Sequence, residues 1–188
     1  MGTSQRWIEG LPVEIIQVGW RLHRPLHDPE FYFRGPARFV PQQQEVGVLY
    51  LASDELTATA EFVGDSKVVA SSDLEKYVLS ELYFPNPLRL IDTTAENFPE
   101  LPGLLHSEDY ELSQIFATEA HDSGFNGVAF PSKYRKYRGK LFAIFGPVGA
   151  REEVKVAKEI GIPKEYFRSL GVEILPYPDP GNRWAGVP

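Results

Sequence analysis

The chain has 188 residues, a formal net charge of −7 and no cysteine. This length suits one domain, residues 1–188, with a substantial core. Without cysteine the chain can form no disulfide, thiolate nucleophile or cysteine metal site. Its acidic charge argues against direct binding to nucleic acid. The chain lacks an apolar run of membrane length and the basic-then-apolar order of a signal peptide, so we expect a cytoplasmic protein without membrane contact.

The first part of the chain predicts two strands separated by an irregular segment. Residues 13–22 are rich in strand-forming side chains with partial alternation and predict the first strand. Residues 27–44 are rich in proline, arginine and aromatic side chains and predict a loop. A short apolar run at residues 48–52 predicts a second, buried strand.

A short helix is expected directly after this second strand. Ser53 is a good N-cap, Asp54 and Glu55 place negative charge in the first turn, and Gly64 is a natural stop. The expected inward stripe consists of Leu56, Ala60 and Val63. Glu61 lies in the last turn, where a carboxylate faces the negative end of the helix dipole at a cost of roughly 0.3–1 kcal/mol if exposed. A residue that breaks a local rule beside the core is a candidate functional residue.

The rest of the chain predicts short strands with a few helices. Strands are expected at 68–69, 77–84, 88–92, 127–130, 140–145 and 172–175, with Pro85 and Pro87 ending the second of them. Helices are expected from an N-cap at Ser107 to Gly124, at 151–160 with Val154, Ala157 and Ile160 inward, and at 164–170. Strands that outnumber helices without regular alternation indicate an α+β fold, built on a curved or two-leaf mixed sheet with flanking helices.

Common catalytic motifs do not occur in the sequence. No metal is expected, because the histidines lack the spacing of paired ligands; they are His23, His27, His106 and His121. There is no Gly-rich phosphate loop and no GxSxG elbow. The basic, aromatic run from Lys133 to Lys140 could contact phosphates, but a solvated loop before a buried strand is the favoured interpretation.

Five polar residues at strand ends and loop edges remain as candidates for a site: Arg24, Arg38, Tyr50, Glu61 and Ser132. Two arginines can hold a diphosphate through forked hydrogen bonds, and a tyrosine can stack on a flat ring. A carboxylate can stabilise a sugar cation, and a serine can bond a ribose or an amide. This set suits a dinucleotide cleaved at a glycosidic bond. Taken singly, each residue is better explained as surface charge, ion pair, core, helix face or turn.

Three segments carry a family resemblance. They are Trp20-Arg-Leu-His-Arg24; Ala37-Arg38-Phe39 with Gly47-Val-Leu-Tyr50-Leu-Ala-Ser and Ala60-Glu61; and Ser113-Gln114-Ile115 with Gly127-Val-Ala-Phe-Pro131-Ser132. On these residues the sequence resembles the RES-domain family, named for its Arg, Glu and Ser. The resemblance covers roughly residues 18–147, has Phe39 where tryptophan is usual, and leaves the proline-rich tail at 176–188 outside.

The resemblance implies an ADP-ribosyltransferase-like fold and a toxin that depletes NAD by hydrolysis or phosphorolysis. NAD would be the substrate, with no metal. Arg24 and Arg38 would hold the pyrophosphate or adjoining ribose, and Tyr50 would line the nicotinamide side. Glu61 would stabilise the oxocarbenium-like transition state, and Ser132 would hydrogen-bond within that pocket. A helical antitoxin with a DNA-binding domain is the implied partner.

Other functions stay open on the sequence. The same donor pocket could serve ADP-ribosyl transfer to a protein acceptor. The chain could also be a catalytically silent nucleotide-binding module, or an immunity or scaffold protein that works through its tail. The acceptor could be water, phosphate or a protein, and the chain could form a homo-oligomer; the sequence decides neither point.

Overall fold

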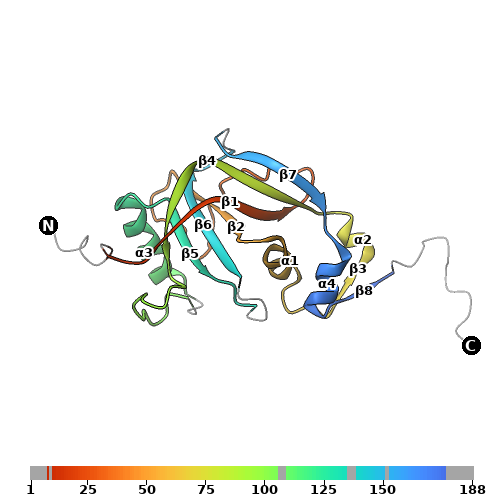
Figure 1. Cartoon of the computed structure of the whole chain (residues 1–188). Coiled ribbons are helices and arrows are strands. Elements are labelled where there is room, and N and C mark those ends of the chain that lie inside the picture. Colours follow the sequence, from red (N-terminus) through yellow and green to blue (C-terminus); the bar gives the residue numbers. More distant parts are fainter. Residues whose placement is uncertain (1–7, 9, 106–108, 135–138, 151–152, 177–188) are drawn as a thin grey trace, which may run out of the picture.

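The structure is a computed structural model that describes residues 8, 10–105, 109–134, 139–150 and 153–176. Its elements in chain order are β1 (Val13–His23), β2 (Val46–Ala52), α1 (Glu55–Val63), β3 (Val68–Ala70), α2 (Ser71–Leu74), β4 (Val78–Asp92), α3 (Glu111–Asp122), β5 (Gly127–Pro131), β6 (Lys140–Pro147), β7 (Lys155–Gly161), α4 (Lys164–Leu170) and β8 (Glu173–Leu175). Helix α3 lies at one end of the molecule and α4 at the other, with α1 between them (Figure 1). The α+β class is confirmed.

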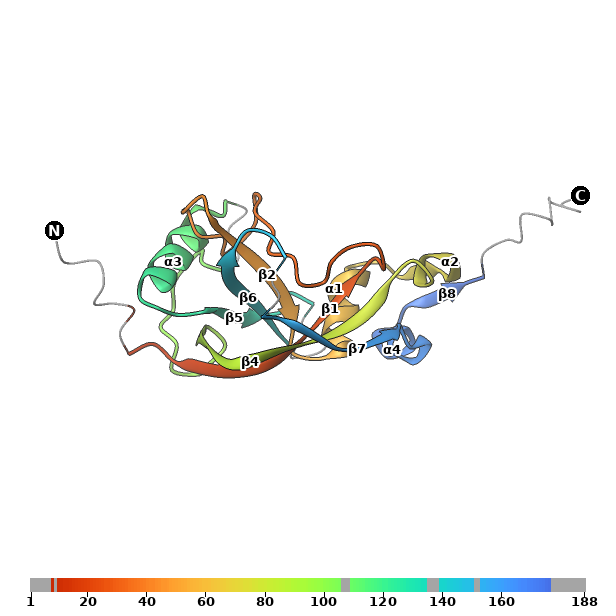
Figure 2. The same cartoon turned by 90° about the horizontal axis from the view of Figure 1, so that it is seen from above.

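The main sheet is mixed and has two leaves. Its strand order is β1-β2-β6-β5-β4-β7, and β1 also pairs with β4, so five of these strands close into a ring. β4 and β5 are parallel, and the other neighbours are antiparallel. β1 and β4 pair along most of their length, whereas β1 and β2 meet at Trp20 and Ala52. One leaf therefore contains β1, β4 and β7 and the other β2, β6 and β5 (Figure 2), as predicted.

Buried apolar side chains form three clusters that hold these elements together. One draws on all five strands of the ring and includes Leu49, Leu82 and Ile144. A second packs α3 against the sheet through Phe116 and Val128, and it includes Phe39 from the irregular loop. The third packs α1 and α4 beside β1; its members include Trp20, Ala58 and Phe167. Helix α1 is thus fixed by the sheet on one side and by α4 on another.

Strand β4 is continuous where the sequence predicted two strands. Ile16 of β1 faces Leu88, but Val18 faces Tyr83, so the register shifts between them. Pro85 and Pro87 lie in the resulting bulge, where a residue need not donate to the ladder. The prolines therefore interrupt the pairing locally and do not end the strand.

The helix predicted at 151–160 is wrong, because residues Lys155–Gly161 form strand β7. β5 pairs with β4 only from Leu90 to Asp92, which leaves the beginning of β4 open along that edge. β7 pairs antiparallel with this open edge. Val154 is buried as predicted, but Ala157 is exposed. Pairing with a distant strand has outweighed a helical pattern that was favourable only locally.

The remaining elements follow the predictions with shifted ends. Helix α3 begins at Glu111, whose N–H bonds the Asp109 carboxylate at 2.9 Å; the predicted cap, Ser107, lies outside the described residues. Helix α1 is capped by Asp54 and not by Ser53, and Leu56 is only partly buried. The predictions of the strands near 68, 127, 140 and 172 and of the helix at 164–170 are confirmed. None of the described helices has the length and apolar character needed to cross a membrane.

Candidate active site

A cavity of about 1200 Å³ lies at the junction of β1 and β2, beside helix α1. Pockets for drug-sized ligands usually measure about 300–1,000 Å³, so this one has room for a larger ligand. The structure brings four of the five predicted site residues to its lining: Arg38, Tyr50, Glu61 and Ser132. They come from a loop, a strand, a helix and a second loop that are well separated in the sequence.

Glu61 and Ser132 meet directly in this cavity. Glu61 lies in the last turn of α1, which ends at Gly64 with a positive φ of 60°. Ser132 follows β5, is buried, and donates its hydroxyl hydrogen to Oε1 of Glu61 at 2.5 Å. The carboxylate that is unfavourable for the helix end is therefore directed into the cavity and held there by a hydrogen bond.

Gly139 allows the segment before β6 to approach α1 closely. A Cβ atom at this position would lie 1.8 Å from Oγ1 of Thr57, which is buried on the helix. The carbonyl of Gly139 accepts a hydrogen bond from the N–H of Ser132 at 3.1 Å. The close packing of Gly139 on α1 thus also positions the serine that bonds Glu61.

Arg38 and Tyr50 are linked by a hydrogen bond between the Tyr50 side chain and the Arg38 backbone. The Tyr50 hydroxyl, at the end of a side chain on β2, donates to the carbonyl of Arg38. The Arg38 guanidinium donates to the carbonyl of Leu104 at 2.9 Å and lies 5.2 Å from the centre of the Tyr110 ring. Burial raises the pKa of Tyr50 well above its ordinary value, so the hydroxyl stays protonated and remains a donor at neutral pH.

The loop that carries Arg38 is organised by a residue that the sequence did not mark as important, Arg34. Its guanidinium donates to four backbone carbonyls, at 3.0, 2.5, 2.8 and 3.2 Å; they belong to Pro41, Gln43, Val46 and Gln42. No local pattern distinguishes Arg34 from Arg38 in the sequence, and its role is seen only when the folded loop brings these carbonyls around the guanidinium.

Phe39, directly after Arg38, has a strained backbone. Its φ is +59°, in the left-handed region that non-glycine residues rarely adopt, and such strain costs on the order of 1–3 kcal/mol. The side chain is fully buried, with its ring centre 4.9 Å from that of Phe130. The buried ring offsets the strained backbone, and the resulting turn presents Arg38 to the cavity.

Arg24 is the predicted residue that does not line the cavity. It is exposed just beyond the end of β1, and its carbonyl accepts a hydrogen bond from Nδ1 of His23 at 2.9 Å. Its guanidinium lies 5.7 Å from the ring centre of Tyr77, which does line the cavity. Arg24 therefore contacts a residue of the cavity wall without lining the cavity itself.

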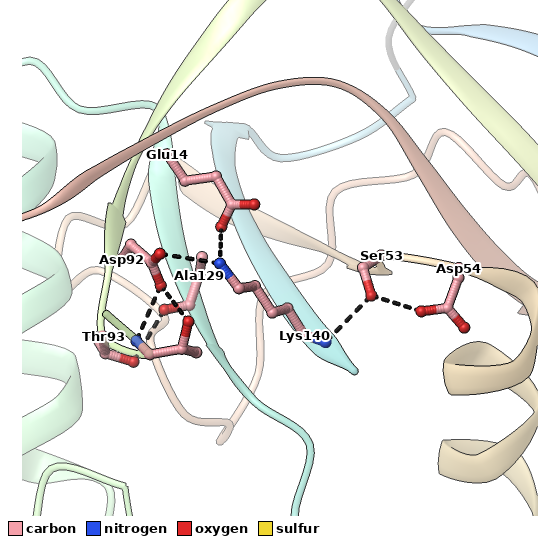
Figure 3. A network of polar contacts seen from close by, with 8 residues as sticks. Glu14, Ser53, Asp54, Asp92, Thr93, Ala129 and Lys140 are labelled. Atoms are coloured by element: carbon pink, nitrogen blue, oxygen red, sulfur yellow. Dashed lines mark hydrogen bonds and ion pairs between the residues drawn. The ribbon is translucent and has the colours of Figure 1, made fainter. Parts of the chain in front are cut away.

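Lys140 forms a charged crosslink in the cavity wall that the sequence did not reveal. Its ammonium group lies 2.9 Å from carboxylate oxygens of both Glu14 and Asp92, tying β6 to β1 and β4 (Figure 3). The backbone N–H of Lys140 donates to Oγ of Ser53 at 3.1 Å. The Ser53 hydroxyl in turn donates to the carboxylate of Asp54, the N-cap residue of α1. Burial favours a higher pKa for Asp92, but hydrogen bonds from Thr94 and Lys140 hold that pKa below its ordinary value.

The basic run is described only in part, since residues 135–138 lie outside the described residues. Lys133 lines the cavity, and its ammonium lies 4.8 Å from the ring centre of Tyr134. In the described part of the chain, no group of three or more histidine, aspartate or glutamate side chains is placed to hold a metal ion.

The split mixed sheet defines an α+β protein with a cavity between sheet and helix. Residues 18–165 match the family model of the RES domain, and the chain belongs to that family. The match confirms the resemblance and extends beyond residue 147, the predicted limit, through β7.

Comparison with curated proteins finds no match. Among solved structures, the chain resembles one in the crystal structure of the M. tuberculosis MbcT–MbcA toxin–antitoxin complex, with a TM-score of 0.59. The likeness covers 82% of this chain and 88% of that chain at 13% sequence identity. At this identity the likeness establishes the shared fold.

Proposed function

We propose that this protein is the toxin of a toxin–antitoxin pair and an enzyme that cleaves NAD at the nicotinamide–ribose bond. The observation that carries the proposal is the hydrogen bond between Ser132 and Glu61 inside a cavity also lined by Arg38 and Tyr50. Membership of the RES family and the fold shared with a chain of a toxin–antitoxin complex support it.

The chemistry requires a negative charge close to the sugar. When the bond from the ribose C1′ to the nicotinamide nitrogen breaks, both electrons leave with nicotinamide and positive charge develops on the ribose. Glu61 stabilises this charge, and the hydrogen bond from Ser132 keeps the carboxylate in one orientation. An acceptor oxygen then bonds to C1′ and loses its proton. Preorganised electrostatic partners of this kind are usually the largest single contribution to catalysis.

The other cavity residues bind the rest of the substrate. NAD carries a diphosphate between two riboses, and the planar guanidinium of Arg38 donates to oxygens of the diphosphate or of the adjoining ribose. Tyr50 lines the nicotinamide side, with its hydroxyl fixed on the Arg38 carbonyl. Arg24, which contacts Tyr77, attracts the diphosphate toward the cavity.

The test is to incubate the purified full chain with NAD, with and without phosphate, and to weigh all products. Free ADP-ribose identifies water as the acceptor, ADP-ribose-1″-phosphate identifies phosphate, and a mass shift on a protein identifies ADP-ribosyl transfer. Binding of NAD without loss would identify a silent binding module and contradict the proposal.

Glu61→Gln tests the mechanism. We expect NAD cleavage to fall by on the order of 10²–10³ with an unchanged melting temperature. Glu75→Gln is the matched control, because Glu75 is exposed and does not line the cavity. Cleavage by Glu61→Gln at the wild-type rate would refute the assigned role of the carboxylate.

The proposed partner is a helical antitoxin that covers the cavity and carries a DNA-binding domain. A gene for a small helical protein directly upstream would supply the candidate. Its product should form a stable complex with this chain and stop NAD loss at a 1:1 ratio. A product that binds the chain without slowing NAD loss would contradict inhibition through the cavity.

A further inference from the structure

The cavity has two ends of different composition. One end is formed by Arg38, Tyr50 and Tyr110, near the core cluster that contains α3. The other, here termed the aromatic end, is formed by Trp20, Phe62 and Tyr77, which belong to or pack against the cluster that contains α1 and α4. The proposed reaction uses Glu61 and the residues of the first end, and leaves the aromatic end unassigned.

Phe62 and Tyr77 form a ring pair in the cavity wall. Phe62 follows Glu61 on helix α1, and Tyr77 immediately precedes β4. Their ring centres lie 4.6 Å apart with planes tilted by 55°. Both side chains are only partly buried although they border the core. The two rings therefore contribute partly exposed apolar surface to the cavity lining, and a flat ligand ring can stack on such surface.

The charge beside the Tyr77 ring is positive, whereas the carboxylate of Glu61 adjoins Phe62 in helix α1. The Arg24 guanidinium lies 5.7 Å from the Tyr77 ring centre. The nicotinamide ring of NAD carries a positive charge, so like charges disfavour nicotinamide at this end. The neutral adenine ring meets no such repulsion, and its adjoining diphosphate is attracted by a guanidinium.

We propose that the aromatic end binds the adenine ring of the dinucleotide by stacking on the Phe62–Tyr77 pair. This inference rests on the proposed function, and it assigns the half of the substrate that does not react. Because Phe62 adjoins Glu61 in the helix, one element of structure sets the position of the adenine subsite relative to the reacting ribose.

The consequence is a selective dependence of affinity on Tyr77. Removal of a ring that stacks on a base weakens binding by about 5- to 150-fold. Tyr77→Ala should therefore weaken binding of ADP by this factor and leave the affinity for nicotinamide mononucleotide, which lacks adenine, unchanged. Tyr77→Phe keeps the ring and should bind both ligands as the wild type does.

The experiment is calorimetric titration of the full chain with ADP and, separately, with nicotinamide mononucleotide. Phe62→Leu provides a second variant that keeps apolar volume while it removes the other ring, and it should also weaken ADP selectively. Tyr83→Ala is the control, since Tyr83 is an exposed tyrosine of β4 outside the cavity lining. Melting temperatures verify that each variant is folded.

The outcomes separate this inference from the proposed function. Absence of ADP binding to the wild type, ADP affinity that does not depend on Tyr77, or an equal loss for nicotinamide mononucleotide would overturn the adenine subsite, whether or not NAD is cleaved. Tyr77-dependent ADP binding without NAD loss would refute the proposed enzyme and leave the subsite standing.

Discussion

Helix α1 and the loop at residues 34–46 each present a charged side chain to the same cavity, by different means. The helix holds Glu61 through its regular backbone hydrogen bonds and an Asp54 cap, whose Oδ1 accepts from the Thr57 N–H at 2.7 Å. The loop is held by a few side chains: the Arg34 guanidinium bonds four carbonyls, and the Tyr50 hydroxyl bonds the carbonyl of Arg38. Stabilisation is distributed in the helix and concentrated in the loop.

This difference determines how each segment responds to damage. A helix that loses one contact keeps the others, and Glu61 keeps its orientation. A loop that loses its central cation leaves carbonyl groups without a donor, and the strained backbone at Phe39 is then less well held. Equal substitutions should therefore have unequal effects on stability, which Arg34→Ala in the loop and Asp54→Ala at the helix test.

Arg34→Ala should lower the free energy of unfolding by on the order of 3 kcal/mol, because hydrogen bonds to charged groups contribute about 1.5–3 kcal/mol each and water replaces only part of that loss. NAD cleavage should fall with it, since the turn that presents Arg38 is less well held. Arg34→Lys should be intermediate, because an ammonium lacks the fork of a guanidinium. Urea unfolding measures the effect, with the exposed Arg168→Ala as control. A loss of stability no larger than that of Arg168→Ala would contradict the idea that the loop depends on one side chain.

Asp54→Ala should cost about 1 kcal/mol, the usual effect of removing an N-cap, and should change NAD cleavage little. Asp54→Asn is the matched control, because asparagine also caps helices well. The same unfolding measurement applies. A loss greater than that of Arg34→Ala would show that the helix, and not the loop, depends on one side chain.

The smallest effect is a pH dependence of the Lys140–Asp92 crosslink, which joins β6 to β4. The pKa of Asp92 is lowered in the folded state, so its contribution to stability is present above its unfolded pKa of about 3.9 and is lost as the pH falls through the folded value. The stability difference between wild type and Asp92→Asn should therefore be larger at pH 7 than at pH 3. If the stability difference between wild type and Asp92→Asn is the same at both pH values, the Asp92 carboxylate does not contribute to the crosslink.

The same contrast between local and distant contacts explains what the sequence could predict. Helix α1 was predictable because its capping residues and its glycine stop are adjacent to it in the chain. Strand β7 was not, because Val154, Ala157 and Ile160 repeat with helical spacing while the open edge of β4 is invisible in the local sequence. Pro85 and Pro87 led to the wrong prediction of a strand end for a similar reason. Only the register of β1 against β4 shows that they occupy a bulge.

The candidate site divides in the same way. Arg38, Tyr50, Glu61 and Ser132 were identified by residue chemistry and by a family resemblance, and they line one cavity. Arg34 and Lys140 were missed because their partners are backbone carbonyls or carboxylates from other strands. Tyr77 was missed because a tyrosine in a strand pattern indicates core packing, and only the cavity shows that its ring remains accessible.

The long pairing of β1 with β4 also bears on the order in which the protein can become active during synthesis. β1 leaves the ribosome first but must wait for β4 before its main partner exists, and pairing between distant segments is slow to form. The cavity draws its lining from Trp20 through Leu141. A nascent chain therefore has no complete cavity lining until Leu141 has been synthesised, so ligand binding at this cavity cannot precede the pairing of β6 with β2.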